Sequence, residues 1–157
     1  MNTHEIWMLH AFKEAEKAYE QNEIPVGAVV VFDNRIIGRG YNQIEMLQDP
    51  TAHAEMIAIT SAVGTIGSKW LNRASLYVTL EPCAMCAGAI VLARLQTLIF
   101  GAFDSKTGAC SSLYNIVQDD RLNHRVDVVS GIMENQCAGI LKDFFAKLRT
   151  QNTAGKG

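Results

Sequence analysis

The chain has 157 residues, of which 48% are apolar and 19% are charged, and its formal net charge is −2. This is the ordinary composition of one globular domain, and the slight acidity gives no general attraction to nucleic acid. No run of about 18 apolar residues occurs, which excludes a membrane-spanning helix, and the N-terminal residues mix charges with apolar side chains, unlike a secretory signal. We therefore expect a cytoplasmic protein whose cysteines stay reduced.

Local signals predict where the first elements begin and turn. Asn2, followed three residues later by a glutamate, is a plausible cap for a helix with apolar residues at helical spacing. The pair Asp33-Asn34 predicts a hairpin turn, because both residues tolerate a positive φ. The pair Asp49-Pro50 reads as an N-cap followed by proline at the first helical position, which predicts a second helix from there.

The alternation of elements predicts an α/β protein. In chain order we expect a helix over 2–19, strands over 26–32 and 35–41, a loop over 42–48, a helix over 49–63, a strand over 76–80, a helix over 82–95, strands over 97–103 and 126–129, and a closing helix over 135–148. About twenty residues separate the last two strands, enough for a parallel crossover. The pattern predicts a three-layer α/β/α fold whose five-stranded mixed sheet has helices on both faces.

Two short motifs each lie at the predicted start of a helix, His-Ala-Glu at 53–55 and Pro-Cys-Ala-Met-Cys at 82–86. Cys83 and Cys86 are three residues apart and therefore share a helical face, close to a helix N-terminus that lowers the pKa of a thiol. Two thiolates and one imidazole suit zinc in tetrahedral geometry, and His53 is the natural third ligand.

The sequence favours an open, catalytic zinc site over a closed, structural one. No second CxxC pair is present, and Cys110 and Cys137 stand alone, so we expect them to be buried thiols. Three protein ligands leave the fourth position to water or hydroxide, whose pKa zinc lowers from about 15.7 to about 7. Glu55 does not share a helical face with His53, so we expect it to carry protons and not to bind the metal.

The order HAE, strand, PCxxC resembles the zinc-dependent nucleobase deaminases, which share that signature. The HAE and PCxxC motifs are common to deoxycytidylate and guanine deaminases, whereas DSKTGA and DFFAKLR resemble the bacterial tRNA-specific adenosine deaminases in particular. Segments similar to that family cover almost the whole chain: EIPVGAVVV (23–31), DPTAHAEM (49–56), LYVTLEPCAMCAGAI (76–90), GAFDSKTGA (101–109), NHRV (123–126) and DFFAKLR (143–149).

The resemblance implies a cytidine-deaminase-like fold in a single zinc-dependent deaminase domain over 1–150, with 151–157 as a frayed tail. It implies one Zn²⁺ per subunit, and it implies a role for each matching residue. The implied roles are zinc ligands for His53, Cys83 and Cys86, general acid and base for Glu55, a hydrogen bond to the flipped adenine for Asn42, packing on the base for Val26, and contact with neighbouring nucleotides for Asp104 and Lys106.

The implied activity is hydrolytic deamination of adenosine to inosine at the wobble position of a tRNA anticodon stem-loop, with an arginine tRNA as the expected partner. The resemblance also implies a homodimer whose RNA site draws on both subunits. The chain departs from the family at 43–49, QIEMLQD, which has no basic residue. Candidates for phosphate contacts are Lys106, Lys142, Lys147 and Arg149.

Two other functions remain open on the sequence alone. The first is the same chemistry on a free nucleotide or base, such as deoxycytidylate, cytidine or guanine. The second is a structural zinc module that binds a partner without catalysis. The role of Glu55 separates the second alternative from a deaminase, because only a deaminase needs a proton carrier beside the zinc.

Overall fold

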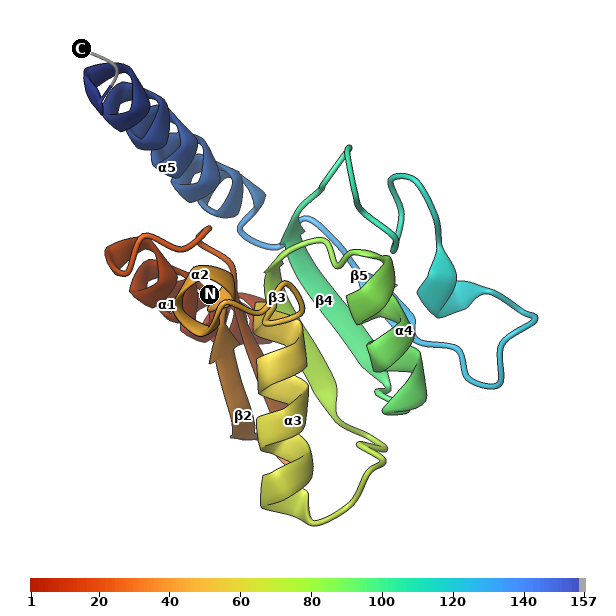
Figure 1. Ribbon diagram of the computed structural model, residues 1–157. Helices are drawn as coiled ribbons and strands as arrows, with labels where there is room; N and C mark the ends of the chain where they lie inside the picture. The colour runs from red at the N-terminus through yellow and green to blue at the C-terminus, as the bar shows by residue number, and fades with distance from the viewer. Residues whose placement is uncertain (156–157) are drawn as a thin grey trace.

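Five strands form one mixed sheet in the order β2-β1-β3-β4-β5 in the computed structural model, which describes residues 1–155 (Figure 1). The strand β1 pairs antiparallel with β2 and β3, whereas β3, β4 and β5 run parallel. The elements are α1 (Thr3–Glu20), β1 (Gly27–Phe32), β2 (Arg35–Tyr41), α2 (Ile44–Leu47), α3 (Ala54–Ile66), β3 (Ser75–Leu80), α4 (Ala84–Leu92), β4 (Thr97–Ala102), η1 (Ile116–Gln118), β5 (Asp127–Val129) and α5 (Glu134–Gly155). The predicted five-stranded mixed sheet is confirmed.

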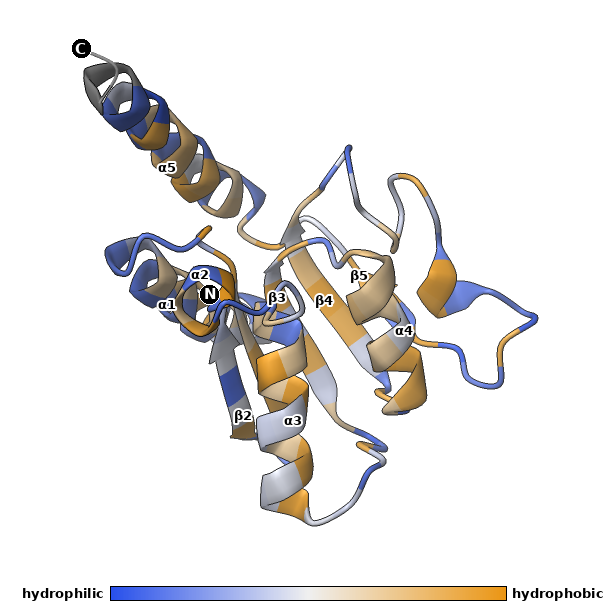
Figure 2. Ribbon diagram, viewed as in Figure 1, coloured by the Kyte–Doolittle hydropathy of each residue, from blue (hydrophilic) through white to orange (hydrophobic). Residues whose placement is uncertain are grey.

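Helices cover both faces of the sheet, so the predicted α/β/α layering is confirmed as well. Alternate residues of a strand point to opposite faces. Val29 and Ile99 therefore pack with Met8 of α1 in one cluster, while Val30 and Leu98 belong to a larger cluster under α3 and α4. Figure 2 shows the hydrophobic colour concentrated on the strands and on the helices that cover them. None of the described helices is long and apolar enough to cross a membrane.

The capping and hairpin signals of the first elements are confirmed. The Asn2 side chain accepts a hydrogen bond from the Glu5 backbone N–H at 2.9 Å and donates one to the Glu5 carboxylate at 2.9 Å. Asp33 and Asn34 have φ values of 52° and 59°, as the two-residue turn between β1 and β2 requires.

The predicted start of the second helix at Asp49-Pro50 is wrong. The Asp49 carboxylate accepts hydrogen bonds from the backbone and hydroxyl of Thr51, at 2.8 and 2.7 Å, and so closes a local turn. Helix α3 begins later, at Ala54, because the Asn42 side chain caps the Ala54 N–H from twelve residues upstream. Within the segment predicted as a loop, residues 44–47 form the short helix α2.

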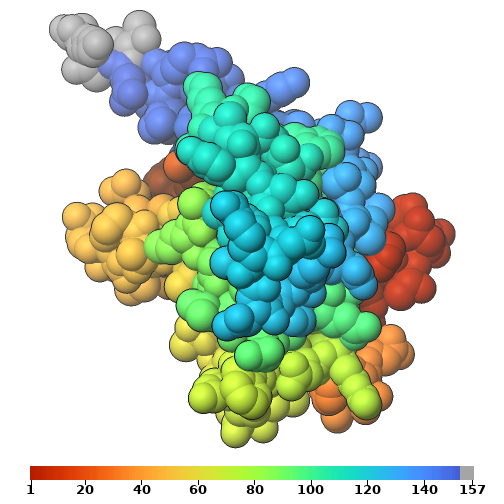
Figure 3. All heavy atoms as spheres, turned by 90° about the vertical axis from the view of Figure 1, so that its right-hand side faces the viewer, coloured from red at the N-terminus to blue at the C-terminus, as the bar shows by residue number. Residues whose placement is uncertain are grey.

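The two later helices also differ in extent from the predictions. Helix α4 spans Ala84–Leu92, not 82–95, because Arg94 adopts a left-handed φ of 58° and the chain turns to bury Leu95. Helix α5 continues to Gly155, through most of the tail expected at 151–157, and residues 156–157 lie outside the described residues. In Figure 1 the C-terminal part of α5 projects away from the sheet. Figure 3 shows the chain between β4 and β5, in teal and light blue, spread over one side of the molecule.

Alanine at Gly27 is expected to destabilise the fold by about 1–3 kcal/mol, because its Cβ would collide with the backbone of Ala11 and Ala15 in α1. The matched control is Gly64→Ala in α3, where an added Cβ meets no atom within 4 Å. That change should stabilise the protein by about 0.5–1 kcal/mol, since glycine is a poor helix former. Thermal unfolding of both variants measures the difference, and equal effects would contradict the close packing of α1 on β1.

Candidate metal centre and active site

The two sequence motifs meet because two helices start at the same edge of the sheet. Strands β2 and β3 both run antiparallel to β1 and are therefore parallel to each other. Helix α3 follows the C-terminal end of β2, and α4 follows the C-terminal end of β3. His53 is the N-cap residue of α3, Cys83 is the N-cap residue of α4, and Cys86 lies in the first turn of α4.

The three side chains fit a tetrahedral zinc ion. The His53 Nδ1 atom lies 3.7 Å from the Cys83 Sγ atom and 3.6 Å from the Cys86 Sγ atom, and all three ligand atoms lie within 4.8 Å of one another. Zinc–sulfur and zinc–nitrogen distances of about 2.3 and 2.0 Å give a tetrahedral S···N edge of about 3.5 Å. The two sulfur atoms and the imidazole nitrogen are therefore spaced as the ligands of a tetrahedral zinc ion would be. No fourth side chain joins the group in the described part of the chain.

Hydrogen bonds within the cluster shift its protonation. Hydrogen bonds with Cys86 and His53 lower the pKa of Cys83 to about 4, and the shared proton raises the pKa of Cys86. The hydrogen bond with Cys83 raises the pKa of His53, and a further bond links His53 to the Pro50 backbone. Such a bond to a backbone group fixes the orientation of a ligating imidazole. The cluster thus favours the thiolate form of Cys83 next to a His53 ring whose orientation is fixed.

Glu55 lies beside the three ligands without joining them. Its side chain is only 4% exposed, lines the same cavity as His53 and Cys83, and makes a hydrogen bond with Cys86. Burial raises the pKa of Glu55 to about 7. A carboxyl group with that pKa takes up and releases protons near neutrality, which is what general acid–base catalysis requires.

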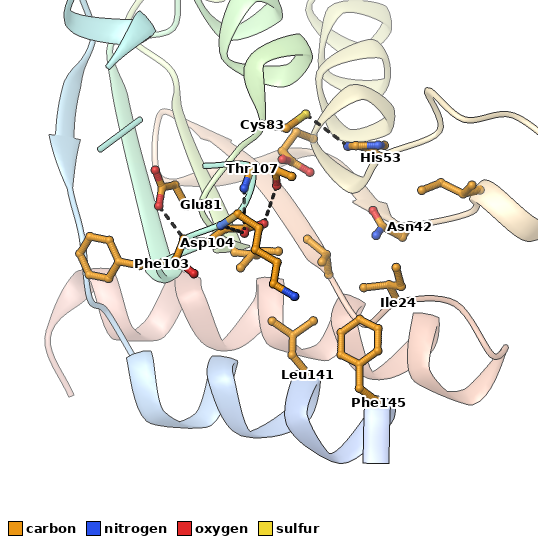
Figure 4. Close-up of a pocket in the computed structure, with 16 residues that line it drawn as sticks. Ile24, Asn42, His53, Glu81, Cys83, Phe103, Asp104, Thr107, Leu141 and Phe145 are labelled. Carbon is orange, nitrogen blue, oxygen red and sulfur yellow. Dashed lines mark hydrogen bonds between the residues drawn. The ribbon is translucent and has the colours of Figure 1, made fainter. Parts of the chain in front are cut away.

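A cavity of about 500 Å³ opens in front of the cluster (Figure 4). This volume is in the range of small-molecule sites. Val26 and Asn42, both buried, form part of its wall. The Asn42 Oδ1 atom accepts the Ala54 N–H at 2.8 Å, and no bond of its Nδ2 atom is found within the described residues. That amide N–H₂ group remains available as a donor to a ligand.

Asp104 and Lys106 of the DSKTGA loop, the two residues expected to contact nucleotides, also line the cavity, but their side chains have different partners. The Asp104 carboxylate accepts hydrogen bonds from the backbone N–H groups of Lys106 and Thr107 at 3.0 and 3.1 Å, and from the Thr107 hydroxyl at 2.7 Å. Asp104 therefore shapes its own turn. Lys106 lines the cavity and is exposed, which leaves its ammonium group free for an anion.

Two aromatic residues at the cavity were not singled out from the sequence. Phe103 is 44% exposed and follows β4, while Phe145 is 40% exposed and reaches the cavity from α5, together with Leu141 (Figure 4). Their signal was present in GAFDSKTGA and DFFAKLR, where an apolar ring stands among polar residues. Because the described structure partly exposes both rings, they offer flat apolar surfaces for stacking.

The remaining cysteines and one histidine serve the fold. Cys110 and Cys137 are free, buried thiols, as the sequence predicts. His124 is partly buried, and its Nε2 atom lies 2.6 Å from the Leu95 carbonyl oxygen. His124 thereby ties the segment before β5 to the turn between α4 and β4.

Comparisons with known proteins agree with this geometry. A family profile described as MafB19-like deaminase matches residues 2–149. The chain is 47% identical to a tRNA-specific adenosine deaminase of Bacillus subtilis over 99% of this chain and 97% of that protein. A solved structure from a study of adenosine-to-inosine editing at the wobble position of transfer RNA shares 45% identity and a TM-score of 0.83, over 87% of this chain and 99% of that one.

A guanine deaminase from Nitrosomonas europaea is 19% identical with a TM-score of 0.79, over 90% of this chain and 84% of that one, and it shares the fold alone. These likenesses confirm the deaminase fold expected from the sequence. The family profile and the 47% identity extend over nearly the whole chain, so the similarity is not limited to the HAE and PCxxC motifs. The chain therefore belongs to the MafB19-like deaminase family and, within it, to the tRNA-specific adenosine deaminases.

Proposed function

We propose that this protein is a zinc-dependent hydrolase that converts adenosine to inosine at the wobble position of a tRNA anticodon. One observation carries the proposal: His53, Cys83 and Cys86 converge beside the buried Glu55 at a cavity of about 500 Å³. The substrate class is supported by the 47% identity to a protein known as a tRNA-specific adenosine deaminase.

The reaction replaces the exocyclic amine of adenine by oxygen from water and releases ammonia. When bound by His53, Cys83 and Cys86, zinc supplies an activated water at neutral pH. Protons must then move from the water to the base and to the departing amine. The Glu55 carboxyl group, buried next to the ligands and outside their set, is placed to carry them.

The cavity walls suit a base that has left its stack. Val26 provides an apolar surface, and the free amide N–H₂ group of Asn42 provides a donor for an acceptor nitrogen of the base. A base extruded from RNA is held by such edge contacts and by stacking. Phe103 and Phe145 at the cavity offer stacking surfaces for the neighbouring nucleotides. Stacking on an aromatic ring accepts any base, so these surfaces suit an RNA loop of varied sequence.

Lys106→Ala is expected to raise KM for an anticodon stem-loop about threefold to tenfold while kcat changes little, because an ammonium group at the cavity contributes to RNA binding and not to the chemical step. The slope of log KM against log salt concentration should also fall by about 1, the change expected when one phosphate contact is lost. The matched control is Lys13→Ala on α1, a lysine that does not line the cavity. Equal effects of the two changes would contradict a specific contact.

We also propose that the protein forms a homodimer. Several large apolar side chains are exposed on and around α4 and η1: Trp70, Leu92, Leu113 and Tyr114. Large apolar side chains left exposed to solvent are candidates for an interaction surface, and the resemblance to the family implies a second copy of this chain as the partner. Light scattering during gel filtration should report twice the chain mass of 17.3 kDa. A mass of one chain at micromolar concentration would contradict the dimer.

A substrate panel on purified, zinc-loaded protein tests the function. It contains an arginine tRNA anticodon stem-loop with adenosine at the wobble position, the same loop with guanosine there, deoxycytidylate, cytidine, free adenosine and guanine. Inosine in the first RNA alone is the expected result. Ammonia from a free nucleotide or base, with the RNA unchanged, would overturn the RNA substrate and favour the small-molecule alternative, for which the absence of basic residues at 43–49 would then account.

A further inference from the structure

Two buried carboxylates next to the cavity have no part in the metal centre. Glu81 is 2% exposed and Glu23 is 1% exposed. Burial of a carboxylate costs free energy unless hydrogen bonds replace its water. Each of these two side chains is satisfied by backbone N–H groups of a segment that forms a wall of the cavity, and each segment makes few other hydrogen bonds to the sheet.

Glu81 binds the loop that follows β4. Its Oε1 atom accepts the Asp104 N–H at 3.0 Å, and its Oε2 atom accepts the N–H groups of Cys110 at 3.2 Å and Ser112 at 2.8 Å. The Ser112 hydroxyl donates a further short hydrogen bond to Oε1. One carboxylate thus collects donors spread over nine residues, from 104 to 112, and holds both ends of the loop to one point.

The close contact between the loop and Glu81 requires glycine at position 108. A Cβ on Gly108 would collide with the carboxylate carbon and Oε1 atom of Glu81. The same segment is tied to the metal-binding motif, because the Ala109 N–H donates to the Pro82 carbonyl at 2.9 Å, one residue before Cys83. The loop that carries Asp104 is therefore held next to the motif that carries Cys83.

Glu23 holds the opposite wall in the same manner. Its two carboxylate oxygens accept the N–H groups of Glu45 at 3.0 Å and Met46 at 2.7 Å, in the first turn of the short helix α2. Ile44, in the same helix, lines the cavity. The segment directly follows Asn42, whose side chain is the donor proposed for the base.

We propose that Glu81 and Glu23 are positioning residues that hold the two walls of the cavity, residues 104–112 and 44–47, in the place where they receive an RNA strand around the target base. The inference rests on the proposed function for its substrate. Neither residue touches the reacting atoms, so each acts through the backbone of its segment.

We call the hydrogen bonds from Glu81 and Glu23 to the backbone of the two walls the anchors. Amide hydrogen exchange measured by NMR tests them directly, without any substrate. In Glu81→Gln the amides of Asp104, Cys110 and Ser112 should exchange about tenfold to a hundredfold faster, because the acceptor loses its charge and one of its oxygens is replaced by an N–H₂ donor, while those of Glu45 and Met46 stay unchanged. In Glu23→Gln the pattern should reverse. Glu14→Gln, which alters a buried carboxylate of α1 paired with Lys17, is the matched control and should change neither set.

Steady-state kinetics on the stem-loop separates positioning from a general loss of structure. Glu81→Gln and Glu23→Gln should each raise KM at least about threefold, with kcat and zinc content close to those of the unaltered protein, because the metal centre is intact. Gly108→Ala should act like Glu81→Gln although it removes no polar group. Ser112→Ala, which removes one of the four hydrogen bonds of Glu81, should have a smaller effect.

Two results would overturn the inference. The first is unchanged exchange of the anchored amides in both carboxylate variants. The second is a lowered melting temperature and a smaller active fraction with an unchanged KM, which is the mark of a purely structural role. If the unaltered protein leaves the stem-loop unreacted, the proposed function fails instead, and the exchange experiment still decides whether the anchors exist.

Discussion

Glu55→Gln is expected to lower kcat for deamination by about 10²–10⁴-fold while the zinc content stays at one ion per chain. The change preserves the shape of a side chain that is buried beside the metal ligands but removes its ability to carry a proton. General acid–base groups contribute about that factor to a rate. Single-turnover inosine formation and metal analysis on the same preparation measure both quantities.

The control for this substitution is the same chemical change at another buried carboxylate, Glu14→Gln in α1. It should keep the activity within about twofold, because Glu14 does not line the cavity that holds the metal ligands and Glu55. Retention of more than about a tenth of the activity by Glu55→Gln would remove Glu55 from the mechanism. Loss of zinc in that variant would make Glu55 structural and would favour the non-catalytic alternative.

Cys86→Ala is expected to abolish both zinc binding and deamination. Its Sγ atom lies 3.6 Å from the His53 Nδ1 atom, and no other side chain within the described residues can take its place in the group. Loss even of a hydrogen-bond partner of a ligand weakens metal binding about tenfold to a hundredfold, so loss of a ligand should exceed that. Zinc content after gel filtration and the inosine assay check the two effects.

The controls for the metal site are the two cysteines outside it. Cys110→Ala and Cys137→Ala should both retain zinc, because neither thiol belongs to the ligand group. Each change removes one buried sulfur and is expected to cost about 1–2 kcal/mol of stability. Loss of zinc in either variant would contradict a three-ligand, open site.

The parts of the fold that follow from neighbouring residues were predictable. The capping pair at Asn2 and the hairpin at Asp33-Asn34 depend on interactions within a few residues, and the central strands are short runs of apolar, mostly buried residues. The start of α3 was not predictable in the same manner. Its cap comes from Asn42, twelve residues away, and the local signal at Asp49 is used for a turn instead.

In the candidate site too, residues in short motifs were predictable, and residues brought in by long-range contacts were not. His53, Cys83 and Cys86 are visible as motifs because zinc chemistry demands those residue types at short spacing. The hydrogen bonds of Glu81 cannot be predicted from EPCAMC, since its donors lie 23 to 31 residues further along the chain and meet it only after the loop folds back. Phe145 joins the cavity only because α5 folds back against β4 and β3, far from it in the sequence.

The most direct test of the proposed function is a position-resolved assay on an arginine tRNA transcript with adenosine at the wobble position. The tRNA is incubated with the zinc-loaded protein and reverse-transcribed, and inosine is read as guanosine in the sequence. We expect guanosine at the wobble position and unchanged adenosine at every other position. An unchanged wobble adenosine, or inosine at other adenosines to the same extent, would contradict the assignment.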